Sequence, residues 1–172
     1  MSTTAGILQF KVSFHCPEEI DFHSICREQG NVNSLSNNDV QMIQCMDNGK
    51  IFAITYGGGL NELSPMGLHS YQCKSFTQKN GLISDIIYSM HEDKQGNLWL
   101  VTGGGLVKFV ASAEQIQYPS EHIAFNMHFS EGVGATDGRQ IFLVLTEVCS
   151  ILPLRISIKQ ILYHKYFSLL FG

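Results

Sequence analysis

The chain has 172 residues and a mass of 19.2 kDa, which is enough for one ordinary domain with a single core. A hydrophobic fraction of 44% with only 15% charged residues excludes a wholly disordered chain. Because the formal net charge is -4, the protein has no overall basic field, and we expect no nucleic-acid partner.

The N-terminal residues 1–33 are expected to be an irregular lead-in or the end of a preceding unit. Two runs rich in aromatic and β-branched residues, 10–14 and 22–26, are candidate strands. The opening MSTTAGILQFKVSF lacks a charged segment followed by a long apolar core, so we expect no signal peptide. A chain made as given is therefore expected in the cytoplasm.

An internal repeat follows, in which residues 34–63 align with residues 81–109. Positions of the same chemical class match at a spacing of 47: Leu35 with Leu82, Val40 with Ile87, Gly49 with Gly96, Phe52 with Trp99, and Thr55 with Thr102. One residue is then missing from the second glycine run, so that Leu60 matches Leu106. A period in the forties is typical of β-propeller blades, each of which has four short strands.

Short strands separated by turns are predicted within each unit. In the first unit they cover residues 40–45, 50–55, 60–63 and 71–76, and in the second residues 97–102, 106–110 and 115–118. The turn at Asp47-Asn48-Gly49 has residue types that tolerate positive φ. The pattern therefore predicts an all-β chain of four-stranded antiparallel blades.

The segments SLSNNDV, DNGKIFAITYGGGLN and GLISDIIYSMHEDKQGNLWLVTGGGLVKF resemble the two-component regulator propeller repeat of Bacteroides-type hybrid sensor histidine kinases. The resemblance covers residues 34–110 and extends more weakly over 124–142. In the first unit, Met46-Asp47-Asn48 and Phe52 depart from the family's Glu-Asp and Trp. The resemblance implies a periplasmic propeller that senses glycan-derived ligands and signals through a membrane helix to a kinase. None of the implied membrane, kinase, receiver or DNA-binding parts is found in this sequence.

The fold class expected is thus a partial β-propeller with a non-propeller C-terminal tail. Residues 1–33 are taken as the end of a preceding blade or a lead-in, 34–80 and 81–122 as blades, 123–142 as a partial blade, and 143–172 as an atypical apolar tail. Since a closed propeller needs at least four blades, we expect exposed faces that neighbouring blades or self-association must cover.

The tail is predicted to be out of frame, because the resemblance stops after Phe142. If the codons permitted for residues 143–154 are read in a frame shifted by one base, they can spell Gly-Ser-Asn-Arg-Gly-Val-Phe-Tyr-Phe-Thr-Pro. This is the motif that the resemblance leads us to expect after Phe142. The alternative is a genuine apolar extension with a short helix at 158–170. Charged and polar residues interrupt the segment 141–172, so no membrane span is expected. Sequencing the coding DNA separates the two hypotheses.

Neither a metal nor another cofactor is expected. The five cysteines are widely spaced without a Cys-x-x-Cys pair, the seven histidines form no paired ligand motif, and the glycine runs lack phosphate-loop spacing. Asp47 and Asp93 are expected to bond turn amides rather than to serve acid–base chemistry beside His91.

Tyr56 is the candidate ligand-binding residue, because it precedes a triglycine turn and an aromatic face can stack on a sugar. Trp99 is also aromatic, but its position in the repeat predicts packing between blades. Asn61 and Lys108 are predicted to lie at solvated strand edges.

The function expected is therefore non-catalytic: this chain is a fragment of a sensory propeller that recognises a glycan-derived small ligand. One alternative is a propeller enzyme of the streptogramin-lyase type, although the sequence shows no convergent His or Glu set for it. A truncated product without independent function is the other alternative.

Overall fold

The structure is a computed structural model that describes residues 5–10, 22–67, 70–118, 127–136 and 141–148, with the last two ranges described by backbone alone. The described residues form twelve strands and one short 3-10 helix, η1 (Gln78–Asn80), and contain no α-helix. The strands are β1 (Ile7–Phe10), β2 (Phe22–Ile25), β3 (Val40–Cys45), β4 (Ile51–Thr55), β5 (Gly59–Pro65), β6 (Tyr71–Phe76), β7 (Ile87–Glu92), β8 (Leu98–Thr102), β9 (Gly105–Val110), β10 (Gln115–Gln117), β11 (Met127–Thr136) and β12 (Ile141–Val148). The predicted all-β class is confirmed.

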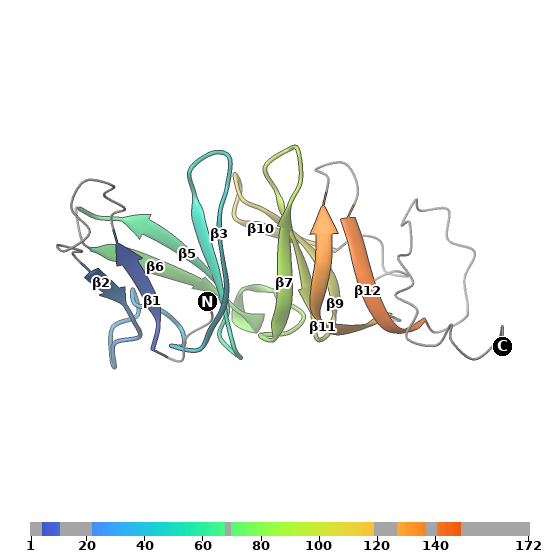
Figure 1. Ribbon diagram of the computed structural model, residues 1–172, viewed down its shortest axis with the longest axis horizontal. Coiled ribbons are helices and arrows are strands. Elements are labelled where there is room, and N and C mark those ends of the chain that lie inside the picture. The colour runs from blue at the N-terminus through green and yellow to red at the C-terminus, as the bar shows by residue number, and fades with distance from the viewer. Residues whose placement is uncertain (1–4, 11–21, 68–69, 119–126, 137–140, 149–172) are drawn as a thin grey trace, which may run out of the picture.

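Four antiparallel units follow one another along the molecule (Figure 1). They are an N-terminal ribbon (β1–β2), sheet I (β3–β4–β5–β6), sheet II (β7–β8–β9–β10) and a C-terminal ribbon (β11–β12). The first strands of the last three units, β3, β7 and β11, lie side by side in Figure 1. The two full sheets are the four-stranded blades that the repeat predicted.

Sheets I and II have the same internal register. In sheet I, Ile51 pairs with Leu63 across β4 and β5, and in sheet II, Leu98 pairs with Phe109 across β8 and β9. The first turns are also alike, since Gly49 N donates to Met46 O at 2.9 Å and Gly96 N to Asp93 O at 3.0 Å. Gly49 has φ of 84°, as the predicted turn requires.

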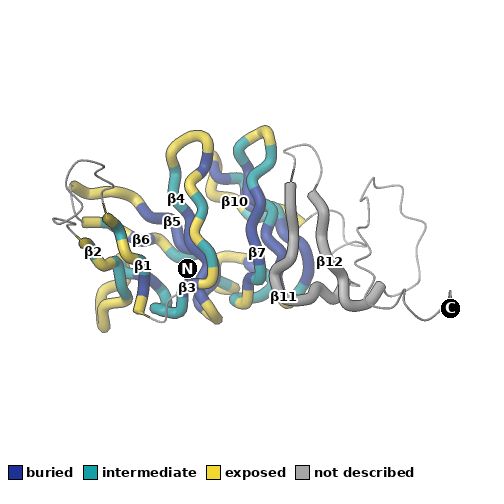
Figure 2. The backbone as a smooth tube through the Cα atoms, in the orientation of Figure 1, coloured by how far each residue is buried: buried dark blue, intermediate teal, exposed yellow. Residues whose placement is uncertain are grey.

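The main core lies between sheets I and II. Along β4, Phe52 and Ile54 point toward sheet II, whereas Ile51 and Ala53 point to the opposite face. This alternation places apolar side chains on both faces of the strand, as expected for a blade buried between two others. Figure 2 shows the buried backbone concentrated in sheets I and II.

The ends of the chain differ in part from the prediction. The first strand begins at Ile7, three residues before the predicted start, and residues 11–14 of the predicted strand lie outside the described residues. At the other end, β12 extends to Val148, six residues past the predicted end of the partial blade at residue 142. Residues 149–172, including the helix suggested at 158–170, lie outside the described residues.

Candidate functional site

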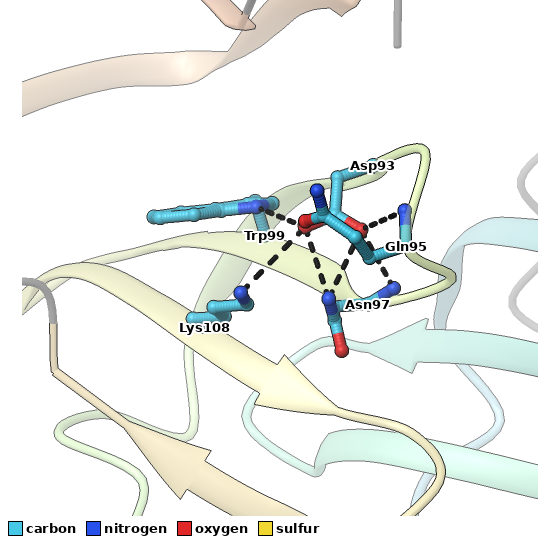
Figure 3. Close-up of polar contacts among 5 residues, drawn as sticks. All are labelled: Asp93, Gln95, Asn97, Trp99 and Lys108. Carbon is cyan, nitrogen blue, oxygen red and sulfur yellow. Dashed lines mark hydrogen bonds and ion pairs between the residues drawn. The ribbon is translucent and has the colours of Figure 1, made fainter. Parts of the chain in front are cut away.

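The best-defined polar cluster surrounds Asp93 in the turn between β7 and β8 (Figure 3). Its carboxylate accepts hydrogen bonds from the backbone amides of Gln95 and Asn97, both at 2.9 Å, and from Asn97 Nδ2 at 3.1 Å. Trp99 Nε1 donates to Asp93 Oδ2 at 3.0 Å, and Lys108 Nζ lies 3.8 Å from the same oxygen. The predicted bonding of Asp93 to turn amides is confirmed.

The same prediction for Asp47 is wrong. In the turn of sheet I it is Asn48 Oδ1 that accepts from Lys50 N, at 2.9 Å, while Asp47 N donates to both carboxylate oxygens of Glu92 at 3.2 Å. The spacing of 47 explains the difference, because the counterpart of Asp93 is Met46, which is buried in the core. The amide side chain of Asn48, two residues after Met46, accepts this hydrogen bond in place of the missing carboxylate.

Trp99 is half-buried and is held from two sides. Its indole N–H is bonded to Asp93, and the ammonium of Lys108 lies 5.6 Å from its ring centroid, at cation–π distance. Its repeat counterpart, Phe52, is fully buried between sheets I and II. Trp99 is opposite Lys108 across β8 and β9, and this pairing brings the ammonium group to the ring.

The environment of Asp93 favours the charged carboxylate. Burial alone raises its pKa, but the hydrogen bonds from the Asn97 backbone and side chain, from Trp99 and from Gln95 outweigh burial, and the pKa is lowered. The folded state therefore binds this proton less readily than the unfolded state. The resulting stabilisation is complete above the unfolded pKa and is lost as pH falls through the folded pKa.

Asp93→Ala is accordingly expected to lower the free energy of unfolding by about 1–3 kcal/mol at pH 7, because the partly buried donors of Asn97 and Trp99 lose their acceptor. The loss should shrink as the pH approaches 3. Urea titrations at both pH values measure it, with Asp47→Ala as the matched control, because this exposed carboxylate in the equivalent turn of sheet I should cost less than about 0.5 kcal/mol. Equal losses for the two variants would contradict the role assigned to Asp93.

Tyr56 lies at the turn between β4 and β5, where the residue is 59% exposed. Its backbone is firmly tied, since Tyr56 N donates to Asp39 O and Tyr56 O accepts from Asn37 Nδ2, both at 2.8 Å. Gln41 Nε2 in turn donates to Asp39 Oδ1. An exposed aromatic ring on a fixed backbone, with amide and carboxylate groups nearby, can contact a polar ligand without reordering the loop.

The predictions for Asn61 and Lys108 are wrong. Asn61 is fully buried, its Oδ1 accepting from Ser36 N at 3.0 Å and its Nδ2 donating to Thr55 Oγ1 at 3.3 Å. Lys108 is partly buried against Trp99. Both strands, β5 and β9, are flanked on both sides within their sheets, so neither residue is at an edge.

Reactive side chains in the described residues are buried or isolated. Burial raises the pKa of the Cys73 thiol to about 11, and burial lowers the pKa of His91, whose Nε2 lies 3.2 Å from Ser89 Oγ. Cys26, Cys45 and Cys73 are free thiols. Among the described residues we find no cluster of acidic, histidine or cysteine side chains that could hold a metal. Nor does that part of the chain contain a helix long and apolar enough to cross a membrane.

Comparison with known proteins identifies the repeat. Residues 81–104 match the family described as the two component regulator propeller. A solved structure, the extracellular domain of a hybrid two component system of B. thetaiotaomicron, is similar over 79% of this chain at 20% identity, with a TM-score of 0.48. The match covers 20% of that chain, so the present chain spans about a fifth of its length. No curated protein matches. The resemblance indicated by the sequence is confirmed, and residues 81–104 carry a two component regulator propeller repeat.

Proposed function

We propose that this chain is part of the ligand-sensing propeller of a hybrid two-component system and has no catalytic activity of its own. The observation that carries the proposal is the family match at residues 81–104, which coincides with the start of a complete four-stranded sheet stacked on a second one. Cys73 and His91, the described thiol and imidazole with perturbed pKa values, are buried within the sheets rather than gathered at an open site. A binding role is consistent with that placement.

The ligand class we propose is a glycan-derived small molecule, and the site we propose for it includes Tyr56. The ring is exposed at the end of β4, and strand ends joined by turns are where propellers present their binding loops. Asn37 and Asp39, which hold the backbone of Tyr56, supply hydrogen-bonding groups of the kind that recognise sugar hydroxyls. The similar structure is an extracellular domain, which supports a periplasmic location for the intact protein.

Tyr56→Ala is expected to weaken oligosaccharide binding by roughly tenfold or more, because the stacking face is lost. The free energy of unfolding should change by less than about 0.5 kcal/mol, since the ring is exposed. Isothermal titration with a panel of neutral and acidic oligosaccharides measures the first effect and urea unfolding the second. Tyr118→Ala, which removes a tyrosine that is 48% exposed after β10, is the control and should leave binding unchanged.

No binding by the wild-type chain to any member of the panel would contradict the proposed ligand class. Binding that survives Tyr56→Ala unaltered would instead place the site elsewhere on the propeller. Both outcomes can be distinguished from misfolding, because the stability of each variant is measured in parallel.

A further inference from the structure

The N-terminal ribbon reproduces the outer two strands of a full sheet. In the ribbon, Phe10 is opposite Phe22, as Leu63 is opposite Cys73 across β5 and β6. The hydrogen bonds to the next unit also correspond: Gly6 N to Asn38 O at 2.9 Å and Arg27 N to Asn38 Oδ1 at 2.6 Å, against Gly59 N to Asp85 O at 3.0 Å and Gln78 N to Asp85 Oδ1 at 2.7 Å. The acceptors, Asn38 and Asp85, are 47 residues apart like the rest of the repeat. β1 and β2 therefore correspond to β5 and β6.

The C-terminal ribbon has the place of the inner two strands. β11 lies against β7 as β7 lies against β3, and β12 pairs with β11 as β8 pairs with β7 (Figure 1). Within the described residues, neither ribbon is joined by a third strand. The first and the last described pairs of strands therefore correspond to complementary halves of one four-stranded sheet.

The outward face of the N-terminal ribbon exposes apolar side chains that are covered elsewhere in the repeat. Phe10 and Phe22 are 51% and 57% exposed, whereas their counterparts Leu63 and Cys73 are 3% and 1% exposed. Leu8 on the same face is 54% exposed. No sheet in the described residues covers this face of the ribbon.

A second uncovered position lies on sheet I. Ile43 of β3 is 48% exposed, although Met90, its counterpart 47 residues later, is fully buried between sheets I and II. The N-terminal ribbon covers the outer part of the same side of sheet I, over Leu63 and Cys73. The uncovered area around Ile43 is therefore continuous with an established interface, at the place where two inner strands are missing.

We propose that two copies of this chain associate head to tail, with β12 of one copy pairing with the free edge of β1 of the other. Each junction then forms a four-stranded sheet in the order β11–β12–β1–β2, and the two junctions close a ring. The added inner strands cover Ile43, and the added outer strands bring Leu8, Phe10 and Phe22 onto the outer part of the partner's sheet II. This arrangement therefore pairs the open edges of β1 and β12 and buries both exposed apolar areas, the one around Ile43 and the one around Phe10 and Phe22.

The strand count fits a closed ring of two copies. Each copy has twelve strands in its described residues, so two copies together supply six four-stranded sheets. Closed propellers have about four to eight blades, and six lies within this range. An aromatic side chain buries about 150–250 Å², so two phenylalanines, a leucine and an isoleucine with the surface that they meet give on the order of 1,000 Å² at each junction. The two junctions together therefore bury on the order of 2,000 Å², which is in the range of stable interfaces. A head-to-tail arrangement that closes into a ring also avoids open filaments.

Sedimentation velocity of the 172-residue chain over a wide concentration range tests the proposal, with an expected limiting mass of twice 19.2 kDa. Phe10→Lys and Ile43→Lys, which act on opposite sides of the junction, should each raise the dimer dissociation constant by roughly tenfold or more. Met66→Lys is the matched control, because Met66 is 66% exposed and lies beyond these areas at the end of β5, and it should leave the constant unchanged.

Far-ultraviolet circular dichroism of the variants separates dissociation from unfolding, since all three side chains are exposed in a single copy. A chain that remains monomeric at every concentration, or that forms an open ladder of masses, would overturn the proposal. So would a dimer that both Phe10→Lys and Ile43→Lys leave intact. The test needs no ligand, so its outcome is independent of the sensing role proposed above.

Discussion

Phe109→Ala is expected to lower the free energy of unfolding by about 3–5 kcal/mol, because the ring lies in the main core. Phe109 of β9 is fully buried, and its ring packs edge-to-face against Phe76 at 4.8 Å and Phe52 at 5.7 Å between centroids. Those two rings belong to sheet I, whereas Phe109 belongs to sheet II. The substitution therefore opens a cavity at the contact that joins the two blades.

Urea unfolding followed by both circular dichroism and tryptophan fluorescence measures this loss, and the single tryptophan, Trp99, reports on sheet II. In the wild type the two signals should change together, because the sheets share one core. Tyr56→Ala is the control, since it removes an exposed aromatic ring and should cost less than about 0.5 kcal/mol. A similarly small loss for Phe109→Ala would mean that the blades do not depend on each other for stability.

The parts of this fold that could be predicted from sequence depend on local residue patterns. Runs of β-branched and aromatic residues along β4 and β8, bounded by the Asn-Gly and Gln-Gly turns, identify strands and their connections without knowledge of distant partners. The constant spacing of 47 then implies that equivalent strands occupy equivalent places. For this reason the four-stranded sheets could be predicted from the sequence, whereas the packing between blades predicted for Trp99 is found at its counterpart Phe52.

The predictions for Asn61 and Lys108 were wrong because a shift of one residue along a strand changes which face of the sheet a side chain is on. The glycine run of sheet I is one residue longer, so the counterpart of Lys108 is Glu62, which is opposite Phe52 as Lys108 is opposite Trp99. Asn61 therefore points to the other side of β5, into the interior, where Ser36 and Thr55 satisfy its amide. A shift of one residue moves a side chain to the other face of the strand. The spacing in the sequence does not show where in the glycine run the extra residue lies, and so does not show which residues change face.

The Asp93 cluster was only partly foreseen for a related reason. The carboxylate and its turn amides are close in sequence, and this local contact was predicted. The approach of Lys108 depends on pairing between β8 and β9, and it places a cation over the face of Trp99. Such contacts between strands need the register before they can be predicted.

Gly59→Ala is expected to lower the free energy of unfolding by about 3 kcal/mol, because two separate costs add at this position. Gly59 has φ of 72°, a conformation that disfavours a side chain. An added Cβ would also lie 2.2 Å from Phe76 O, a backbone atom of the neighbouring strand that cannot move without separating β5 from β6. The shift would disturb the hydrogen bond from Gly59 N to Asp85 O, which links sheet I to the segment before sheet II.

Gly49→Ala separates these two costs, since Gly49 has φ of 84° but open space where the Cβ would stand. This control should therefore cost only about 1 kcal/mol, the price of the left-handed conformation alone. Urea unfolding of the two variants gives the difference, which measures the close approach of β6 to β5. If both variants lose the same stability, the gap at Gly59 can widen without cost. The close approach of Phe76 O to Gly59 would then not limit stability, and the left-handed conformation alone would account for the loss at both positions.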